Sequence, residues 1–435
     1  MFGTSGIRGV FNKEVTPELA LQVGLAFLGK GKTLFLGRDT RPSGPVLENA
    51  LASGAMSAGG DVVRLGIAPT PTTAYASRSS LGAMITASHN PPEYNGIKLF
   101  ESGEEIPRGR ETLIEKTVRE RSWALDGPGS ERIISTAIRE HMELVLGAVD
   151  VALIQKKKPK VLVDAGNGAG CVIMPYVLRE AGCKVVALNC EPSGCFARGL
   201  EPNSQNLEET ARIARSIGAD LAIAHDGDAD RAIILDEKGL MLGLDSQLAL
   251  ICQEMLSRRK GTVVTTVEAS LAIREAIENY GGKVEIASVG SLHVAQSLKK
   301  RGGVFGGEPC GEYIFPKNHL VPDGIMAGLK FAEMFCENGS LHDAVGKIKT
   351  YPMKRAKYPC KDRSKSIARI LKKAGDIGGK QTIGDGIRAD FGGGWVLIRA
   401  SGTEPIVRIT CEHKDKKELE ALFSKAEKIV RGSLS

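Results

Sequence analysis

The chain has 435 residues, which corresponds to about three or four domains at roughly 150 residues each. Hydrophobic residues make up 42% and charged residues 25%, a composition that is typical of folded globular proteins and excludes a disordered or fibrous chain. The formal net charge is +7, but the basic residues are spread along the sequence, so nucleic-acid binding is not indicated.

Short apolar strands, each ending in a polar loop and followed by a helical segment, predict α/β units with mainly parallel sheets up to about residue 345. The predicted strands are 32–39, 81–86, 160–164, 220–225, 262–266 and 283–286, and the predicted helices begin at Ile173 and cover 272–279. The pattern occurs three times, so we expect three α/β domains.

The sequence changes in character from about residue 346. A basic stretch and a glycine-rich turn at 392–394 precede one apolar strand at 395–398, and apolar residues at three- and four-residue spacing predict an amphipathic C-terminal helix. These residues are Leu419, Leu422, Phe423, Ala426, Ile429 and Val430. We therefore divide the chain at 1–150, 151–248, 249–345 and 346–435, and we interpret the lysine-rich run 155–160 as a solvated linker.

The cysteines and the N-terminal segment bear on the cellular compartment. The 9 cysteines include no C-x-x-C pair and the 7 histidines show no metal-type spacing with them, which disfavours a disulfide framework and a structural zinc site. The N-terminal residues lack an apolar signal core, and no charge-free stretch approaches the roughly 18 apolar residues of a membrane span. We therefore expect a cytoplasmic protein without a membrane partner.

Three carboxylates, those of Asp226, Asp228 and Asp230, follow the fourth predicted strand. Alternate side chains of an extended backbone share a side, so the three would converge and repel one another unless a hard cation such as Mg²⁺ or Ca²⁺ binds. The spacing matches the first ligands of an EF-hand, with Glu237 at the twelfth position. However, Arg231 stands where that loop needs glycine, and a strand follows. A solvated acidic turn is the alternative.

Ser88 and His89 follow the predicted strand 81–86, which places a hydroxyl beside an imidazole at the rim of a sheet. Ser88 is a candidate nucleophile, and a turn-forming role is equally open. No G-x-S-x-G motif is present, so a hydrolase nucleophile elbow is not supported.

The loop after the strand 395–398 has the residue types that bind phosphate. A guanidinium can hold two phosphate oxygens, and glycine leaves backbone amides open to an anion. A capping turn with ordinary surface arginines is equally compatible. The candidate residues are Arg399, Ser401, Gly402, Thr403 and Arg408.

Two glycine-rich segments resemble nucleotide-binding motifs and fail in detail. The segment 24–30 spells G-x-x-x-x-G-K, but Gly31 stands where a P-loop requires Ser or Thr, and the segment is typical of an apolar helix. In 166–171, Cys171 replaces the third glycine of a dinucleotide loop, and a tight turn is the better interpretation.

Taken in order, these loops resemble one family, the α-D-phosphohexomutases, which include phosphoglucomutase, phosphomannomutase and phosphoglucosamine mutase. The matching segments are 2–9 (FGTSGIRG), the Ser88 loop with 94–98 (YNGIK), the triple-Asp loop, 306–311 (GGEPCG) and 399–405 (RASGTEP). The resemblance implies an α/β, four-domain architecture. Three similar mixed-sheet domains and a smaller C-terminal α+β domain would surround one central cleft.

The resemblance also implies a mechanism. Ser88 would be carried as phosphoserine, and its phosphate would pass to a free sugar hydroxyl. This gives a hexose 1,6-bisphosphate, which turns over in the cleft and returns its other phosphate to Ser88. The implied Mg²⁺ ligands are Asp226, Asp228, Asp230 and a phosphoserine oxygen. The groups implied to surround the phosphoserine are Arg8, His89 and Lys98, with Lys98 preferred over His89 as acid or base.

The implied substrate contacts are Arg231, Glu308, Cys310, Gly311, Glu312, Arg399, Ser401, Gly402, Thr403 and Arg408. The commonest family pattern has Ser and His two and four residues after the glutamate, where this chain has Cys310 and Glu312. We hypothesise that Glu312 suits a protonated 2-amino group. The segment 401–405 also looks like that of phosphoglucosamine mutase of the archaeal type, so glucosamine phosphate is the first expectation.

Other functions remain open at this point. Glucose or mannose phosphate would be handled by the same mechanism. A sugar-phosphate sensor without catalysis and a calcium-binding module are alternatives of other classes, and the intact Ser88 loop argues against both. The expected partner is a small sugar phosphate, and the sequence is compatible with a homodimer.

Overall fold

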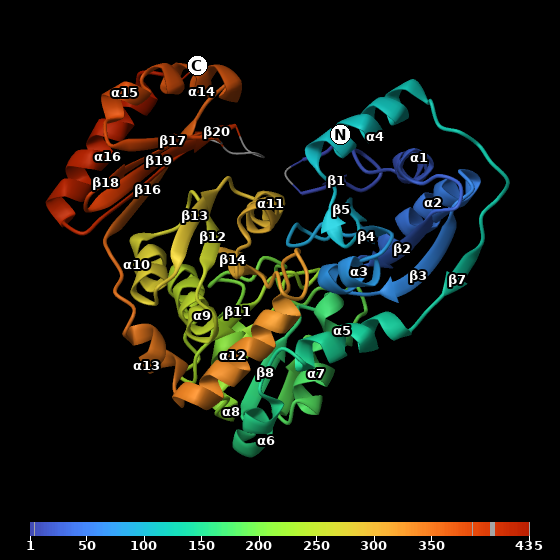
Figure 1. The fold of residues 1–435 in the computed structure, drawn as a ribbon, viewed down its shortest axis with the longest axis horizontal. Coiled ribbons are helices and arrows are strands. Elements are labelled where there is room, and N and C mark those ends of the chain that lie inside the picture. The colour runs from blue at the N-terminus through green and yellow to red at the C-terminus, as the bar shows by residue number, and fades with distance from the viewer. Residues whose placement is uncertain (4, 385, 401–404, 435) are drawn as a thin grey trace.

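The computed structural model describes residues 1–3, 5–384, 386–400 and 405–434. Four sheets follow one another along the chain. Figure 1 shows their domains arranged in sequence around the molecule, from blue through green and yellow to red. The expected α/β architecture is therefore confirmed: three mixed sheets precede a C-terminal sheet whose paired strands are all antiparallel.

The first domain contains a sheet of order β1-β5-β4-β2-β3-β7, with β6 paired to β5. Its elements are β1 (Ile7–Val10), α1 (Pro17–Phe27), β2 (Thr33–Arg38), α2 (Gly44–Ser57), β3 (Asp61–Ile67), α3 (Thr70–Ala76), β4 (Leu81–Ile85), β5 (Tyr94–Glu101), β6 (Glu104–Glu105), α4 (Arg108–Glu120), β7 (Glu131–Ile133) and α5 (Thr136–Leu146).

The second and third domains have four-stranded sheets. The second contains α6 (Val151–Lys157), β8 (Lys160–Asp164), the 3₁₀ helix η1 (Ala169–Val172), α7 (Met174–Glu180), β9 (Lys184–Leu188), α8 (Glu208–Ile217), β10 (Leu221–Ala224) and β11 (Ile233–Leu235). The third contains α9 (Leu244–Arg258), β12 (Thr262–Thr266), α10 (Leu271–Asn279), β13 (Lys283–Ala287), α11 (Ser291–Arg301), β14 (Phe305–Glu308), β15 (Glu312–Ile314), α12 (Gly324–Asn338) and α13 (Leu341–Gly346).

The fourth domain differs from the single strand expected after residue 346. Its sheet has five strands, in the order β16-β20-β19-β18-β17. The elements are β16 (Met353–Pro359), α14 (Arg363–Lys372), α15 (Ala374–Ile377), β17 (Lys380–Ile383), β18 (Gly386–Phe391), β19 (Gly394–Ala400), β20 (Ile406–His413) and α16 (Lys416–Arg431). The expected C-terminal helix is present as α16, and its apolar residues pack on this sheet.

The lysine-rich run 155–160, interpreted as a linker, contains the end of one helix and the start of a strand: residues 155–157 belong to α6, and Lys160 begins β8. Helix α6 begins after Asp150, whose side chain accepts a hydrogen bond from Leu153 N, and it ends at Lys157. Lys158 then takes a left-handed conformation with φ 52°. Lys156, Lys157 and Lys158 are exposed as expected, but Lys160 Nζ donates to Ile217 O, and Ile154, just before the run, is buried in the core. The predicted domain border at residues 248 and 249 falls inside α9.

The first three sheets share one strand order. The second reads β9-β8-β10-β11, the third β13-β12-β14-β15, and the first contains β3-β2-β4-β5. In each, the last parallel strand (β4, β10 or β14) is followed by an antiparallel partner (β5, β11 or β15). In each domain, the loop that joins these two strands therefore leaves the carboxyl end of a parallel strand. Open α/β sheets bind ligands at that end.

The second and third domains are joined by one hydrophobic core. It combines Val163 of β8 and Ile223 of β10 with Val263 of β12 and Phe305 of β14. Helix α12 follows β15 in sequence but packs against α6, α7 and β10 of the second domain. The first and fourth domains have main cores of their own, although Met142 and Val145 of α5 join the middle core and Trp395 of β19 packs with Val267 of the third domain. The middle of the molecule is thus one packed unit flanked by two others.

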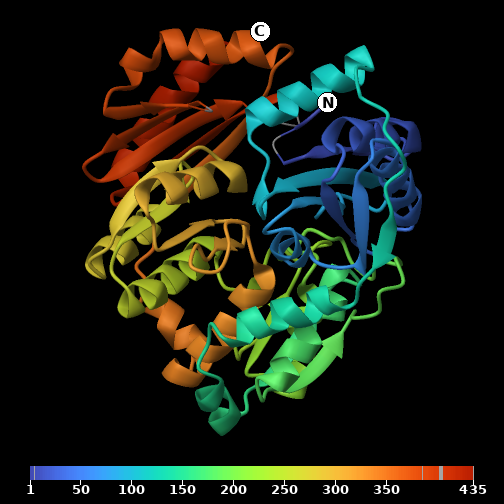
Figure 2. The same ribbon diagram turned by 45° about the vertical axis from the view of Figure 1, so that its right-hand side comes forward.

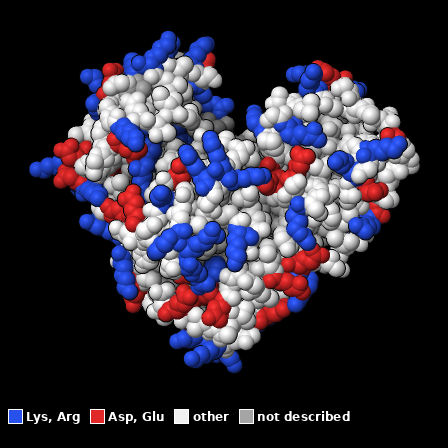
Figure 3. All heavy atoms as spheres, viewed as in Figure 1, with Lys and Arg blue, Asp and Glu red and all other residues white. Residues whose placement is uncertain are grey.

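The domains leave a hollow at the centre of the molecule's upper edge. Figure 2 shows the fourth domain stacked on the third, with the first domain opposite. In Figure 3 the surface is notched between the fourth and first domains, and Lys and Arg side chains gather below the notch, over the region of α11. Among the described helices, none has the length and apolar character needed to cross a membrane.

Candidate active site

Ser88 lies in the loop between β4 and β5, with 2% of its surface exposed. Its φ of 52° is in the left-handed region, which a non-glycine residue occupies only when its surroundings hold it there. Ser88 Oγ donates a 2.6 Å hydrogen bond to Asp226 Oδ2 and lies 3.2 Å from His89 Nδ1. The structure therefore brings the candidate nucleophile of the first domain onto the triple-Asp loop of the second.

The two loops also meet through their backbones. A Cβ atom on Gly227 would lie only 2.5 Å from Ser88 O, so a side chain has no room at this position. Behind it, a Cβ atom on Gly168 would lie 2.6 Å from Gly227 O. The glycine-rich turn at 166–171 is thus a tight turn, as predicted, and it supports the triple-Asp loop.

The carboxylates of Asp226, Asp228 and Asp230 are buried, and one oxygen of each lies within 4.8 Å of the others. Lys98 Nζ of β5 donates to Asp228 Oδ2 and to Asp230 Oδ2, both at 2.7 Å. Thr70, the first residue of α3, donates to Asp228 Oδ2 at 2.5 Å. The first domain therefore supplies partners for carboxylates of the second.

Charge and burial act strongly on these groups. Burial, reinforced by Asp230 and Asp228, raises the pKa of Asp226. Burial alone would lower the pKa of Lys98, but its two carboxylate partners outweigh burial and raise that pKa. Burial together with the charges of Arg231 and Arg8 lowers the pKa of His89 to about 3, so its imidazole is neutral near pH 7.

The three aspartates fit a hard divalent cation. Asp228 Oδ1 and Asp230 Oδ1 are buried and have no hydrogen-bond partner among the described residues. A buried carboxylate oxygen without a donor is unfavourable, and an oxygen-only ligand set suits Mg²⁺ or Ca²⁺. Ser88 Oγ, already in contact with Asp226, is placed to add a further oxygen.

Arg8 of β1 pairs with Gly96 of β5, the strand that also carries Lys98. Its Nε is buried and has no hydrogen-bond partner among the described residues. Its charge contributes to the lowered pKa values of His89 and Asp228. An unsatisfied guanidinium donor near Ser88 is suited to an anion such as a phosphate.

The loop between β14 and β15 lies against the triple-Asp loop. Arg231 Nε and Nη2 contact Glu312 Oε1 at 3.1 Å and 3.0 Å, and the two residues also form a backbone bridge. Ala232 N donates to Gly311 O at 3.0 Å. These two site loops, from the second and third domains, are therefore held edge to edge.

Two carboxylates face each other in this third-domain loop. Glu308 and Glu312 are direct partners in the β14–β15 ladder. Glu308 accepts a 3.1 Å hydrogen bond from Gly290 N, and burial, then the charge of Glu312, raises its pKa well above the ordinary value. The same two causes raise the pKa of the Cys310 thiol. Like charges placed opposite each other are unfavourable unless a cation joins them.

Two arginines of the fourth domain are cross-strand neighbours. Arg399 of β19 pairs with Arg408 of β20. Arg399 Nη1 also contacts Glu268 Oε1 of the third domain at 2.6 Å. Adjacent guanidinium groups are suited to binding a phosphate. The other predicted members of this loop, Ser401, Gly402 and Thr403, lie outside the described residues.

The sequence alone does not single out Thr70 or Arg41, although both contact the site. Thr70 follows β3 and Arg41 follows β2, so each lies just beyond the carboxyl end of a parallel strand. Arg41 Nη2 donates to Ser88 O at 2.8 Å. The only signal for these residues is their position after a strand, and it does not indicate which loop they contact.

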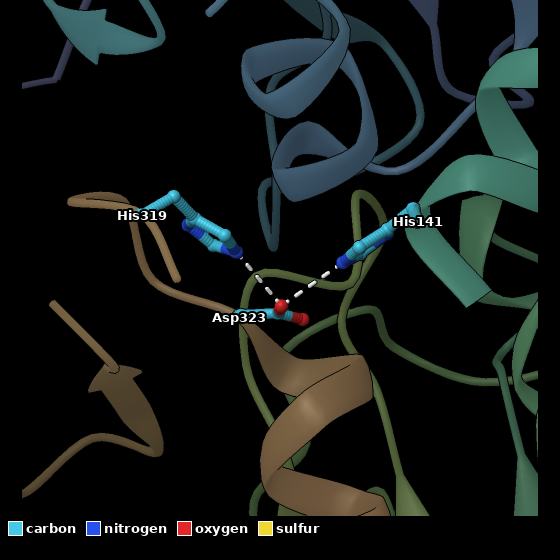
Figure 4. A group of neighbouring side chains, drawn as sticks. All are labelled: His141, His319 and Asp323. Atoms are coloured by element: carbon cyan, nitrogen blue, oxygen red, sulfur yellow. Dashed lines mark hydrogen bonds and ion pairs between the residues drawn. The ribbon is translucent and has the colours of Figure 1, made fainter. Parts of the chain in front are cut away.

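A second cluster contains metal-binding residue types but is hydrogen-bonded. Figure 4 shows His141 of α5 and His319 pointing at Asp323, which precedes α12. Their Nε2 atoms lie 3.0 Å and 2.9 Å from Asp323 Oδ2, and Thr72 Oγ1 of α3 lies 2.8 Å from His141 Nδ1. Ligands of one tetrahedral zinc stand about 3.3 Å apart at Zn–N near 2.0 Å. The shorter distances between these atoms favour hydrogen bonds that link α3, α5 and α12 over a zinc site.

Comparison with known proteins agrees with this fold. Sequence profiles of the phosphoglucomutase/phosphomannomutase family match in order: α/β/α domains I, II and III at residues 1–124, 139–239 and 244–351, and the C-terminal domain at 355–429. The chain belongs to this family. It is therefore a phosphohexomutase, an enzyme of the isomerase class, as the motifs predicted.

Relatives match over the full length. A probable phosphoglucosamine mutase of Methanosarcina acetivorans is 42% identical over 444 residues, covering 100% of this chain and 99% of the relative. A phosphoglucomutase/phosphomannomutase of Thermococcus kodakarensis is 40% identical over 454 residues, with the same coverage. The crystal structure of a family protein from Burkholderia thailandensis superposes with a TM-score of 0.90 at 25% identity, covering 100% of this chain and 98% of that one.

Proposed function

We propose that this phosphohexomutase interconverts glucosamine 6-phosphate and glucosamine 1-phosphate, with Ser88 as the phosphoryl carrier. The observation that carries the proposal is the 2.6 Å hydrogen bond between Ser88 Oγ and Asp226 Oδ2. It joins the hydroxyl of Ser88 in the first domain to a carboxylate cluster of the second domain that fits Mg²⁺. The full-length likeness to relatives named phosphoglucosamine mutase supports the choice of sugar.

The proposed reaction is a double phosphoryl transfer. The bond between phosphorus and Ser88 Oγ breaks as phosphorus bonds to the free sugar hydroxyl, which gives a hexose 1,6-bisphosphate. After the sugar turns over, its other phosphate returns to Ser88. Mg²⁺ held by Asp226, Asp228 and Asp230 would offset the charge on the phosphoryl oxygens. Such transfers depend mainly on positioning and electrostatics.

A proton must leave the attacking hydroxyl and reach the departing Ser88 oxygen. His89 lies 3.2 Å from Ser88 Oγ, and Lys98 contacts two of the aspartates. The family resemblance favours Lys98 as acid or base, whereas the contact with Ser88 favours His89. We retain both candidates, with Arg8 binding the phosphate itself.

The phosphate that is not transferred would bind to the fourth domain. Arg399 and Arg408 are neighbours on its sheet, and the predicted contacts Ser401, Gly402 and Thr403 follow Arg399. Glu268 contacts Arg399 at 2.6 Å, so substrate phosphate would replace a carboxylate there. This domain has a main core of its own. A separately packed domain suits a phosphate-binding site that must accept both orientations of the sugar.

The opposed pair Glu308 and Glu312 supports an amino sugar. Arg231 offsets one of these two charges through Glu312. A protonated 2-amino group would supply a second cation between them, with Cys310 and Gly311 in the turn beside it. Glucose or mannose phosphate is the alternative, and the 40% identity to a phosphoglucomutase/phosphomannomutase is the observation that favours it.

The Ser88→Ala variant tests the carrier. Because Ser88 would be the nucleophile, its loss should lower kcat at least about 10⁴-fold. Intact mass should show phosphate on the wild type, after incubation with a hexose 1,6-bisphosphate, and none on the variant. Ser80→Ala is the matched control, since Ser80 donates to Thr33 O outside the site. A Ser88→Ala enzyme with wild-type turnover refutes the mechanism.

Removal of the metal tests the aspartate cluster. EDTA should abolish wild-type turnover, and added Mg²⁺ should restore it.

The Glu312→Gln variant tests the choice of sugar. It should lower kcat/KM for glucosamine 6-phosphate about tenfold or more, because the amine loses a charged partner. The neutral sugar phosphates serve as internal controls, since any disturbance of Arg231 acts on all three substrates alike. If the wild type prefers glucose or mannose 6-phosphate, and Glu312→Gln leaves that preference unchanged, glucosamine specificity is wrong.

A further inference from the structure

Arg41 is buried behind the Ser88 loop, and the proposed function assigns it no role. It lies between β2 and α2, and its side chain is 0% exposed. Its Nε donates to Asp39 Oδ2 at 3.0 Å, so the guanidinium charge is paired inside the protein. A buried, paired arginine is unfavourable unless its remaining donors are also used.

All the remaining donors of Arg41 reach one segment of backbone. Nη2 donates to Ser88 O at 2.8 Å and to Asn90 O at 2.7 Å. Nη1 donates to Pro91 O at 2.6 Å and to Tyr94 O at 2.8 Å. With Asp39, these acceptors use the whole donor capacity of a guanidinium group. One side chain therefore holds the irregular loop 88–94 at both ends and in the middle.

Asp39 adds a second link to the same loop. Thr86 Oγ1 donates to Asp39 Oδ2 at 2.7 Å and accepts from Ser88 N at 2.8 Å. Ser88 is thus held at its carbonyl by Arg41 and at its amide by Thr86. These contacts bracket the residue whose φ of 52° needs support.

We infer that Arg41, oriented by Asp39, is a positioning residue for phosphoryl transfer, holding the Ser88 backbone so that Oγ faces Asp226. The inference rests on the proposed function of Ser88. Arg41 donates to the loop backbone and acts on the reaction only through it. A misplacement of reacting groups by about 1 Å can cost about 100-fold in rate, so a loop fixed at several carbonyls has a direct kinetic role.

Arg41→Lys is the test variant. A lysine keeps the charge but has three donors on one nitrogen, so it cannot reach the spread of carbonyls that the guanidinium holds. We expect kcat to fall about 100-fold per folded molecule, with KM for the sugar phosphate changed less than about threefold. Phosphorylation of Ser88 by a hexose 1,6-bisphosphate should slow in parallel. Amides in 88–94 should exchange hydrogen faster while those of β2 stay protected.

Arg64→Lys is the control, because Arg64 is another ion-paired arginine of the first domain, with 16% of its side chain exposed, and it pairs with Glu131 at 2.9 Å, away from the loop. It should keep wild-type kcat. If Arg41→Lys does not fold, Thr86→Val removes the second link while leaving Arg41 in place, and it should lower kcat about tenfold without changing KM.

The outcomes separate the two proposals. A folded Arg41→Lys enzyme with wild-type kcat and unchanged exchange in 88–94 overturns the positioning role. So does a loss of activity that merely follows the loss of folded protein. If the wild type carries no phosphate on Ser88, the proposed function fails whatever the behaviour of Arg41.

Discussion

The absence of a side chain at residue 227 lets two loops of the candidate active site touch. Ser88 O would be 2.5 Å from a Cβ atom at that position. Since carbon and oxygen do not approach so closely, a methyl group would push the Ser88 loop away from the triple-Asp loop. The 2.6 Å hydrogen bond between Ser88 and Asp226 depends on this contact.

Gly227→Ala should therefore reduce both activity and stability. We expect kcat to fall about 100-fold through misplacement of Ser88, with a loss of about 1 to 3 kcal/mol in the free energy of unfolding. Gly243→Ala is the control, because the nearest atom to its added Cβ would be Ser246 Oγ at 3.7 Å. Steady-state kinetics and chemical denaturation measure both effects. Wild-type kcat in Gly227→Ala would show that the loops do not need this close approach.

The sequence indicates site residues that belong to motifs and misses those that act from separate loops. Ser88 and the aspartates lie in recognisable runs after apolar strands. Arg41 is one arginine in a turn, and only the fold shows which carbonyls it reaches. His141 and Asp323 are 182 residues apart, so no spacing rule could pair them.

At the scale of elements, several short apolar strands were predictable from the sequence, and the charged strand β16 was not. β8, β10 and β12 are apolar runs and were predicted within one residue of their observed ends. β16 reads Met-Lys-Arg-Ala-Lys-Tyr-Pro and alternates charged with apolar residues at the edge of its sheet, so it resembled a basic stretch. The sequence indicated one strand in the fourth domain, and β16 is one of the further strands that the described residues of its sheet contain.

Asp323 both caps helix α12 and accepts hydrogen bonds from two histidines. Its Oδ1 accepts from Ile325 N and Met326 N, both at 3.0 Å, and so caps α12. Its Oδ2 accepts from His141 and His319. Burial would raise the pKa of Asp323, but the two imidazoles outweigh burial and hold it below the ordinary value. Its charge therefore stabilises the fold above the unfolded-state pKa, near 3.9, and this contribution is lost as pH falls below it.

Asp323→Asn should lower the free energy of unfolding by about 3 kcal/mol at neutral pH, because a buried imidazole N–H loses its acceptor. Asp415→Asn is the matched control. Asp415 caps α16 through Lys417 N and Glu418 N in the same way but has no buried histidine partners, and we expect a loss of about 1 kcal/mol or less. Denaturant titrations should show the difference between wild type and Asp323→Asn shrinking below about pH 3.9. A pH-independent difference contradicts this assignment.

At the scale of the whole molecule, the second and third domains form one unit. Leu329 of α12 is fully buried in the core that both domains share, although α12 follows the third sheet in sequence. The sequence suggested a border in this region because strand patterns restart there. Packing between the two domains depends on α12 returning to the second domain. The spacing of apolar residues does not indicate which domain a helix packs against.

Leu329→Ala should weaken both middle domains together, by about 2 to 5 kcal/mol. Hydrogen exchange should accelerate in β8 and β10 as well as in β12 and β14, while β18 and β19 keep their protection. Val396→Ala, in the separate core of the fourth domain, should give the opposite pattern. Acceleration confined to one middle domain would mean that the shared core does not unfold cooperatively.

Three equivalent hairpins carry three different tasks in this enzyme. The β4–β5 loop holds the candidate nucleophile, the β10–β11 loop the carboxylates and the β14–β15 loop the opposed glutamates. On the proposed function each role belongs to its own domain, so the residues proposed to select the hexose are encoded more than 70 positions away from the proposed nucleophile and metal ligands. Substitutions in the β14–β15 turn can therefore change the range of sugars accepted while the phosphoryl chemistry is inherited intact. That separation lets one catalytic frame evolve toward new substrates.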